Sequence, residues 1–407
     1  GLGARVTELS EAHAHTGFET HVFFIGDPSF PGHESLAGGK LHLHRWCQWI
    51  SEHHPGGVYD GEPGKLADWE QSLVPWLESE LIATQIEADV PVVVLAEEWQ
   101  TANTMTQLAE MIRRRGWQGN VHLFWNANHV FGFEHIDWPS LRRAATITTV
   151  SRFMRQALAQ HGVQEVRVVP NGIAEAWFWP LNAAESRQMG RLLRNRLSLV
   201  KVARWDPDKG WAQAVSAVAE LKKRGMQPLF LARGGHEPYR RTVMARIRTH
   251  GLDVGTARWT GNRPSELVEA MAPALKHDVV LLDGFLSLEQ RRVLFHAADF
   301  VLANSSMEPF GLVGLETMAV GGVAFVGSTG EDYAHPGHDA LSVETSDPRE
   351  IVEKVMGLNR MPGDGRLLRQ RARRSARHYS WPAVLKGRLL PLTHPRVPEP
   401  PSDGRAA

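Results

Sequence analysis

The sequence predicts an α/β protein built from two domains with mainly parallel sheets. Its 407 residues are enough for two or three domains. In both halves of the chain, short apolar runs of strand type alternate with helical patterns, which is typical of crossover units in parallel sheets. A polar helical linker is expected at residues 183–196, between the halves. We therefore expect one domain with a parallel sheet at residues 1–178 and a second at residues 179–378.

Composition argues against several classes of protein. Apolar residues make up 43% of the chain and charged residues 22%, as in ordinary globular proteins. Lys plus Arg equals Asp plus Glu, with 45 of each, so no basic field favours binding to nucleic acid. No apolar run approaches the roughly 18–20 residues that span a bilayer, and the first residues do not resemble a signal peptide. The single cysteine, Cys47, fits a reducing compartment, so we expect a cytoplasmic protein.

The chain opens with Gly1-Leu2-Gly3, which predicts a glycine loop in front of a helix at residues 4–15. A strand is expected at residues 21–25. Such a glycine loop should itself follow a strand, and none precedes it here. We therefore expect that the first strand of the domain is missing.

Histidines alternate with leucines along the next strand pattern. His42 and His44 therefore share one strand face. Two histidines at this spacing can bind a metal, but the sequence suggests no third ligand, so a polar strand face is favoured and no metal site is predicted. Residues 56–65, rich in turn residues, predict a long loop, and an amphipathic helix is expected at residues 69–82.

Two junctions between a strand and a loop carry candidate functional residues in the first half. One is the polar loop at residues 96–102, which follows a buried strand. The other follows a strand at residues 121–125 and contains Asn126 and His129. A loop histidine can act as an acid or base near neutral pH, so His129 is a candidate functional residue and His135 a weaker one. A merely solvated loop histidine is the alternative for His129.

The second half begins with a strand at residues 199–203, and the loop after it holds Arg204 and Lys209. Both cations can reach a diphosphate group and neutralise its charge. A metal site at Asp206 and Asp208 is the alternative. A helix start is favoured there, because Pro and Asp are common at the first positions of helices. Further parallel strands are expected at residues 228–231, 279–282 and 300–303.

Residues 300–331 predict a strand, a loop, a helix and a second strand, which together form a parallel crossover unit. Glu308 and Gly311 precede the helix, and Glu316 lies inside it. A helix N-terminus favours an anion such as phosphate, and Gly311 allows close approach of a ligand because it has no Cβ. The two carboxylates can accept hydrogen bonds from sugar hydroxyls. The alternative is that both are solvated helix residues.

The segment Glu308-Pro309-Phe310-Gly311-Leu312, followed by Glu316, resembles the E-x7-E signature of retaining glycosyltransferases of the family 4 type. The resemblance implies that Glu308 lies beside the donor sugar and that Glu316 holds the ribose. It also implies that the backbone from Pro309 to Leu312 contacts the sugar and the diphosphate.

Other segments resemble the same family in the expected order. They are Gly1-Leu2-Gly3, the loop at residues 96–102 (a partial match to glycogen and starch synthases), the T-V-S and V-P-N-G-I segments at residues 149–151 and 169–173, and the spacing of Arg204 and Lys209. The resemblance implies that the opening amides face the donor diphosphate and that Asn126 or His129 lies near the reacting end of the sugar. Arg204 and Lys209 would stabilise the leaving diphosphate. Phe285 and Leu286 are expected to line the side of the pocket that binds the base.

The fold implied by the resemblance is GT-B, with two Rossmann-like domains that face each other across a cleft. The C-terminal half would hold the nucleotide sugar and the N-terminal half the acceptor. A helix at residues 379–390 would cross back to the first domain, ahead of a disordered tail at residues 391–407.

The implied reaction transfers a hexosyl unit from UDP-, ADP- or GDP-hexose to the hydroxyl of a carbohydrate or other acceptor, with retention at the anomeric carbon. No cofactor and no metal are expected, since Arg204, Lys209 and a helix N-terminus already supply positive charge. The alternatives are a nucleotide-sugar-binding protein without transferase activity, and an epimerase or phosphorylase of the same fold.

Overall fold

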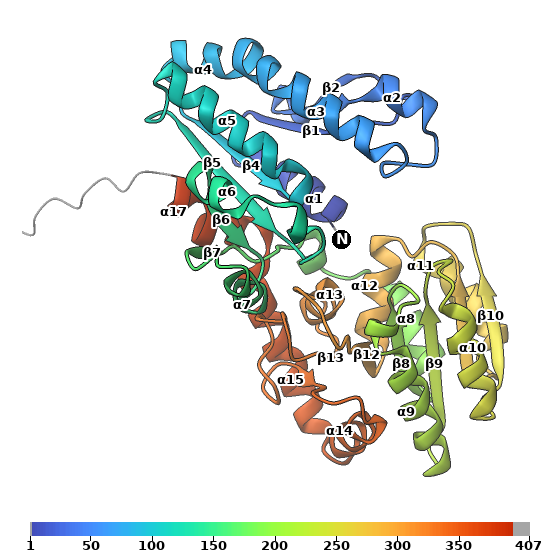
Figure 1. The fold of residues 1–407 in the computed structure, drawn as a ribbon. Coiled ribbons are helices and arrows are strands. Elements are labelled where there is room, and N and C mark those ends of the chain that lie inside the picture. Colours follow the sequence, from blue (N-terminus) through green and yellow to red (C-terminus); the bar gives the residue numbers. More distant parts are fainter. Residues whose placement is uncertain (1, 394–407) are drawn as a thin grey trace, which may run out of the picture. The chain divides into compact units, whose positions relative to one another are not determined.

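The computed structural model describes residues 2–393 (Figure 1). The chain divides into two compact units. Unit 1 comprises Gly1–Val150, Met154–Gly172 and Trp381–Ala407, and unit 2 comprises Ser151–Phe153 and Ile173–Ser380. Part of the predicted tail is helical, since α17 covers Leu390–Thr393. The predictions for Gly1 and for residues 394–407 fall outside the described residues.

Unit 1 contains a four-stranded parallel sheet with the order β4-β5-β6-β7. Its elements are β4 (Val92–Glu97), α5 (Ala102–Arg115), β5 (Val121–Ala127), α6 (Trp138–Ala144), β6 (Thr146–Thr149), α7 (Arg152–Gln160) and β7 (Val166–Val168). β4 and β5 extend beyond their apolar runs, because Glu97 and Asn126 are paired in the register of the sheet. Asn126 is therefore a strand residue, and its prediction as a loop residue was wrong.

A separate three-stranded sheet, with the order β1-β3-β2, completes the strands of unit 1 in the described part of the chain. β1 and β3 are parallel, and β2, which was not predicted, is antiparallel to β3. The elements are α1 (Leu2–His15), β1 (Thr20–Ile25), β2 (His33–Leu36), β3 (Leu41–Trp46), α2 (Gln48–His53), α3 (Glu62–Trp76) and α4 (Ala83–Glu87).

Two helix starts in unit 1 differ from the predictions. α3 continues through a π-helical segment, Leu77–Ile82, into α4, and it begins at Glu62 rather than near residue 69. Pro63 lies in its first turn, where the missing N–H costs no helical hydrogen bond. The predicted loop at residues 56–65 is therefore shorter than expected. α1 begins at Leu2, so Leu2 and Gly3 are helical and do not form the predicted glycine loop.

The C-terminal helical segments pack within unit 1 against α1. They are α16 (Trp381–Val384), a π-helical segment (Leu385–Leu389) and α17. Trp381 Nε1 donates a hydrogen bond of 3.0 Å to Glu8 Oε2, and its ring shares a buried cluster with Leu9 and Val169. A Cβ on Gly172 would lie 2.5 Å from the Trp381 ring, so glycine is required at that position.

Unit 2 is a seven-stranded parallel sheet with the order β10-β11-β9-β8-β12-β13-β14. Its strands are β8 (Leu197–Val202), β9 (Pro228–Arg233), β10 (Val254–Arg258), β11 (Val279–Asp283), β12 (Phe300–Ala303), β13 (Ala324–Val326) and β14 (Leu341–Ser342). Its helices are α8 (Ala183–Leu193), α9 (Trp211–Lys223), α10 (Arg240–Thr249), α11 (Pro264–Met271), α12 (Leu288–Ala297), α13 (Leu312–Ala319), α14 (Pro348–Arg360) and α15 (Pro362–Ala376).

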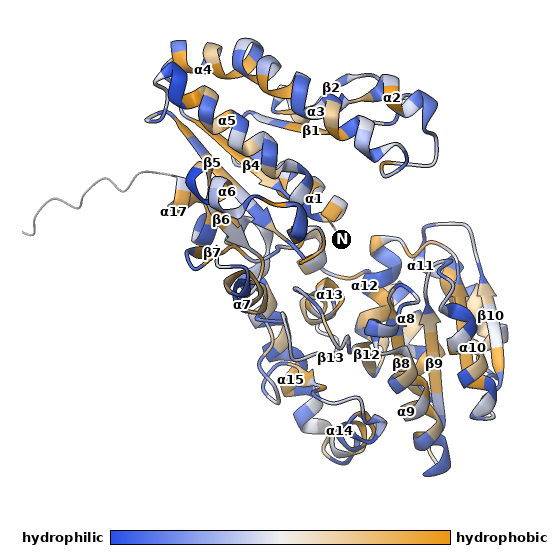
Figure 2. Cartoon of the chain, viewed as in Figure 1, coloured by the Kyte–Doolittle hydropathy of each residue, from blue (hydrophilic) through white to orange (hydrophobic). Residues whose placement is uncertain are grey.

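The sheet of unit 2 is buried between helices, and Figure 2 shows hydrophobic residues along β9 and hydrophilic residues on α10. β10 and β14 at the sheet edges were not predicted, because β10 alternates buried and exposed residues and β14 has only two residues. The linker predicted at residues 183–196 is mostly helical, as expected, and its helix α8 packs against α11 and α12. Its buried Met189 and Leu193 show that it belongs to the unit 2 core.

Candidate active site

The strand order of unit 2 reverses direction at β8. From β8 the chain continues to β9, β10 and β11 on one side and then returns to β12 on the other side. β8 and β12 are therefore neighbours at a switch point of the strand order, and open α/β sheets bind ligands at the carboxyl ends of the strands there. The loop after β8 carries Arg204 and Lys209, and the loop after β12 carries Glu308 and Gly311.

Hydrogen bonds to backbone carbonyl groups hold these two loops together. Ser306 N donates a hydrogen bond of 2.8 Å to Asp208 O, and Asn304 Nδ2 donates one of 3.3 Å to Gly210 O. Gly210 precedes α9 with φ of 67°, and a Cβ there would lie 2.1 Å from Asn304 O. Only glycine fits this junction, so the sequence fixes the relative position of the loops.

Lys209 and Glu308 form an ion pair across the switch point. The distance from Lys209 Nζ to Glu308 Oε2 is 3.0 Å, and a second carboxylate, Asp208, lies 3.2 Å from the same ammonium group. Burial alone would lower the pKa of Lys209, but the charges of Glu308 and Asp208 outweigh it and raise the pKa. The site thus holds a charged lysine beside a carboxylate that is still partly exposed.

The loop after β13 fixes the backbone of Glu308. Gly330 N donates a hydrogen bond of 2.9 Å to Glu308 O, and Thr329 Oγ1 accepts one of 2.9 Å from Glu308 N. Glu331, which is buried, accepts hydrogen bonds from Gly327 N and Thr329 N at 3.2 and 3.1 Å. Burial raises the pKa of Glu331 to about 7, against the effect of these N–H groups. Three loops at one sheet edge therefore form a single hydrogen-bonded structure.

Gly311 adopts a left-handed conformation, with φ of 79°, immediately before α13. A Cβ on this residue would lie 3.0 Å from Glu331 Cγ and 3.2 Å from Glu308 Cγ. Glycine at this position therefore lets the side chains of Glu308 and Glu331 pack against the start of α13. The neighbouring Phe310 side chain is 2% exposed and packs against Tyr333, so only the backbone of Phe310 can face a ligand.

Glu316 lies within α13, where it is 7% exposed. Arg291 Nη1 contacts both of its carboxylate oxygens, at 2.9 and 3.0 Å, and the Arg291 guanidinium lies over the ring of Trp177. The predicted contact of Glu316 with a ribose would have to use the lone pairs that Arg291 leaves available.

Lys201 is a buried lysine at this site that was not predicted from the sequence. Its Nζ donates hydrogen bonds of 2.9 Å to Leu302 O and 2.7 Å to Asn304 Oδ1, so it connects β8 to the end of β12. Burial lowers the pKa of Lys201 to about 7, and the charge of Lys209 acts in the same direction. A lysine inside an apolar strand is the sequence signal that indicates such a residue.

The carboxyl ends of β4 and β5 in unit 1, together with Arg5 of α1, form a second polar cluster around Glu97. Glu97 Oε1 accepts from Arg5 Nε at 3.0 Å, and Glu97 Oε2 accepts from Asn126 Nδ2 at 2.9 Å and Asn128 Nδ2 at 2.7 Å. Asn126 Oδ1 also accepts from Thr148 Oγ1, at 2.9 Å. Both the nitrogen and the oxygen of the buried Asn126 amide therefore have partners in the sheet, which argues against it as a catalytic contact.

Glu98 is strained and buried beside His129. Its φ is 71°, which is unusual for a residue with a side chain, and it is 3% exposed. Glu98 Oε2 lies 3.3 Å from His129 Nδ1 but has no aligned hydrogen bond within residues 2–393. Burial raises the pKa of Glu98 to about 7, and burial lowers the pKa of His129. This pair was missed from the sequence, because nothing local indicates that Glu98 is buried.

Comparison with known families agrees with this geometry. A family described as Glycosyl transferase 4-like domain matches residues 1–172, and the family of Glycosyl transferases group 1 matches residues 184–379. The chain belongs to the group 1 glycosyltransferases. The group 1 family membership expected from the sequence is thereby confirmed.

Individual relatives are distant. D-inositol 3-phosphate glycosyltransferase from Acidothermus cellulolyticus is 27% identical over 243 residues, which is 58% of this chain and 50% of that protein. The chain thus spans about half the length of the curated relatives it matches.

Solved structures show the fold. Sucrose-phosphate synthase from Thermosynechococcus elongatus has a TM-score of 0.64 at 20% identity, covering 94% of this chain and 90% of that one. HepE from Anabaena, in complex with UDP and glucose, has a TM-score of 0.62 at 13% identity, covering 94% of each chain. The α/β architecture is therefore that of GT-B glycosyltransferases, as predicted.

The remaining predicted site residues of this glycosyltransferase differ in their exposure to solvent. Arg204 is exposed at the start of its loop, and its carbonyl accepts from Trp211 Nε1 at 2.7 Å. Phe285 is 73% exposed after β11, whereas Leu286 is buried in the unit 2 core and offers no side-chain surface. In unit 1, His135 is exposed and its ring packs against Trp99.

Asp206 and Asp208 have structural partners in this glycosyltransferase. Asp206 Oδ1 accepts from Asp208 N at 3.3 Å and so caps the short 3-10 helix Pro207–Lys209. Asp208 pairs with Lys209. This arrangement supports the helix-start interpretation over a metal site.

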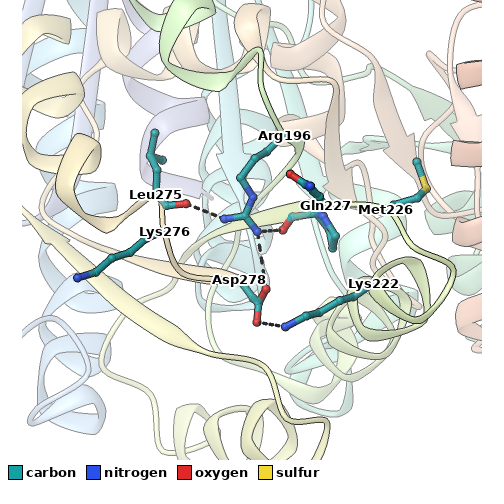
Figure 3. A pocket seen from close by; sticks show the side chains of 8 residues that line it. Arg196, Lys222, Met226, Gln227, Leu275, Lys276 and Asp278 are labelled. Carbon is teal, nitrogen blue, oxygen red and sulfur yellow. Dashed lines mark hydrogen bonds and ion pairs between the residues drawn. The ribbon is translucent and has the colours of Figure 1, made fainter.

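A cavity at the opposite edge of the unit 2 sheet has a structural role. It is lined by residues near the amino ends of β8, β9 and β11 (Figure 3). The Arg196 guanidinium donates to Leu275 O at 2.6 Å and contacts Pro228 O, and Lys222 pairs with Asp278 at 2.6 Å. These charged groups already have partners, so the cavity is a weaker candidate for a ligand site than the switch point.

Among the described helices, none combines the length and apolar character needed to cross a bilayer.

Proposed function

We propose that this glycosyltransferase moves a hexosyl unit from a nucleoside diphosphate hexose to an acceptor hydroxyl, with retention at the anomeric carbon. The observation that carries the proposal is the Lys209–Glu308 pair, 3.0 Å long, at the switch point of unit 2. It is supported by the structural likeness to HepE, which is seen with UDP and glucose. The donor base would be uracil, adenine or guanine.

The two partners of this pair would separate when the donor binds. Lys209, together with Arg204 and the N–H groups at Gly311 and Leu312, would bind the diphosphate oxygens. Glu308 would accept hydrogen bonds from the sugar hydroxyls. Glu316 would accept from the ribose, and Phe285 would lie beside the base.

The chemical step breaks the bond between the anomeric carbon and the phosphate oxygen, and it forms a bond from that carbon to the acceptor oxygen on the same face. The acceptor proton passes to the leaving phosphate oxygen, so the products are a glycoside and a nucleoside diphosphate. Lys209 and Arg204 stabilise the charge that develops on the diphosphate, so the step needs no metal and no cofactor. A double-displacement hydrolase fits poorly, because Glu316 is buried and paired with Arg291.

Unit 1 would bind the acceptor. Glu98 and His129 form its titratable pair, and with a pKa of about 7 Glu98 can exchange a proton near neutral pH. The acceptor would be a carbohydrate or another hydroxyl compound.

A thermal-shift panel of nucleoside diphosphates and their hexoses would test the proposal, using wild type, Lys209→Ala and a control, Lys223→Ala, at an exposed position on α9. One nucleotide sugar should stabilise the wild type and the control but not Lys209→Ala, and EDTA should leave this shift unchanged. Acceptors are then screened with that donor, and NMR of the new anomeric proton shows whether configuration is retained. Donor binding without turnover would favour a binding protein, and turnover without acceptor would favour an epimerase.

A further inference from the structure

One face of the three-stranded sheet in unit 1 carries four histidines. His21 on β1 is opposite His42 on β3, and His33 on β2 is opposite His44 on β3. Side chains that are opposite in register, or two apart along a strand, share a face of the sheet. The ring centroids of neighbouring histidines in this cluster are 4.5 to 5.5 Å apart.

The ring nitrogens approach one another as closely as the ligands of a single ion do. His33 Nε2 lies 3.3 Å from His42 Nδ1, and His21 Nδ1 lies 3.0 Å from His44 Nε2. Glu19 adds a carboxylate oxygen 3.2 Å from His21 Nε2. Ligand atoms around a tetrahedral zinc ion, with bonds of about 2.0–2.1 Å, are about 3.3 Å apart.

Three of these residues meet the spatial requirement for a shared ion. One ligand atom from each of Glu19, His21 and His42 lies within 4.8 Å of the other two. We propose that Glu19, His21 and His42, with His33 as the fourth ligand, bind a divalent transition-metal ion such as Zn²⁺. Imidazole nitrogens with one carboxylate are the donor set that such ions accept. The proposal uses none of the residues assigned to glycosyl transfer and does not depend on that function.

Neighbouring groups orient the proposed ligands. The Gly39 carbonyl accepts a hydrogen bond of 3.0 Å from His42 Nε2, which leaves the lone pair on Nδ1. His44 is 9% exposed, its ring centroid lies 4.4 Å from that of the stacked Phe23 ring, and its Nε2 contacts His21 Nδ1. Such contacts fix the tautomer and the direction of metal-binding imidazoles. The stacked rings of His21 and His42 would turn about their side-chain bonds so that their lone pairs converge on the ion.

The ion would connect strands that bury little of their surface in the apolar core. β1 is half-buried along its length and β2 is largely exposed. A metal ion bound to Glu19, β1, β2 and β3 would stabilise this sheet, because binding to the native state alone adds to the free energy of unfolding.

The test is a titration of the full chain with ZnCl₂ after chelator treatment, in competition with a chromophoric chelator. We expect one tightly bound equivalent, a higher Tm, and visible absorption typical of tetrahedral cobalt when CoCl₂ replaces zinc. The double variant His21→Gln/His42→Gln should bind at least 100-fold more weakly. The control double variant His15→Gln/His53→Gln, at exposed positions outside the cluster, should bind like wild type.

The chain has 20 histidines, so adventitious binding must be separated from the proposed site. Equal zinc affinity in the two double variants, or a wild type that binds no more tightly than the His21/His42 variant, would overturn the proposal. If that variant does not fold, the exposed His33→Gln replaces it, with an expected loss of about tenfold. An unchanged affinity in His33→Gln would then reject the site as proposed.

Discussion

Lys209 and Glu308 are 99 positions apart in the sequence, yet their side chains meet at 3.0 Å. The meeting results from the neighbouring positions of β8 and β12 in the sheet and from the contacts of Asn304 and Ser306 with the β8 loop. In the free protein the two charges neutralise each other. In the proposed complex, the diphosphate of the donor would replace Glu308 as the partner of Lys209, and the sugar hydroxyls would replace Lys209 as the partners of Glu308.

Replacing Glu308 with Gln should reduce kcat/KM for transfer by about 10²–10³-fold, because the charge that interacts with the sugar is lost while the shape is kept. Steady-state kinetics with the identified donor measures the effect. Glu269→Gln, an exposed position on α11, is the control and should retain wild-type kinetics. Full activity in Glu308→Gln would remove this residue from the proposed mechanism.

Gly311→Ala should weaken donor binding as well as stability. A residue with a side chain at φ of 79° costs about 1–2 kcal/mol, and the added Cβ would also press on Glu331 and Glu308. Gly225→Ala is the matched control, since its φ is 81° and its surroundings are open. Both variants should show a lower Tm, but only Gly311→Ala should lose donor affinity by calorimetry. Equal donor affinity in the two variants would contradict the role assigned to the start of α13.

Glu98 should make stability depend on pH between about 4.5 and 7. Its pKa in the folded protein is raised to about 7, so the folded state holds a proton that the unfolded chain releases near its ordinary pKa. The contribution of Glu98 is therefore fully present below about pH 4.5 and is lost as the pH rises through 7, by roughly 3 kcal/mol. In the Glu98→Gln variant the side chain at this position is neutral at every pH, so the variant lacks this contribution to the pH dependence of stability.

Denaturant unfolding of wild type and Glu98→Gln across this pH range measures the difference. The stability of the wild type relative to the variant should fall as the pH rises from 5 to 8. A constant difference would mean that Glu98 is ionised in the folded protein at all these values.

Local patterns predicted much of unit 2. The strand at Phe300–Ala303 was placed at its observed bounds, and Glu308, Gly311 and Glu316 occupy the expected positions around α13. These features depend on apolar runs and on turn residues within a few positions of each other. The pairing of Lys209 with Glu308 could be expected only through the family resemblance, because it depends on which strands are neighbours.

Features that depend on distant contacts were missed. Asn126 looked like a loop residue because it is polar, but Glu97 and Thr148 satisfy its amide inside the sheet. The histidine face was read as having no third ligand, since His21 and His33 join it only through the pairing of β1 and β2 with β3. Gly1-Leu2-Gly3 suggested a loop from its glycines, although glycine at position 3 is accommodated in the first turn of α1.

The pairing of Glu316 with Arg291 leads to a prediction about nucleotide selectivity. If Glu316 also accepts a hydrogen bond from the ribose, the wild type should bind the ribonucleoside diphosphate at least tenfold more tightly than its 2′,3′-dideoxy analogue, since a hydrogen bond to a charged group is worth about 1.5–3 kcal/mol. Glu316→Gln should lose most of this preference. Glu289→Gln, which removes another arginine-paired glutamate of unit 2, should keep it. Calorimetric titration of the three proteins with both nucleotides measures the preference, and an undiminished preference in Glu316→Gln would leave Glu316 with the structural role of holding Arg291 alone.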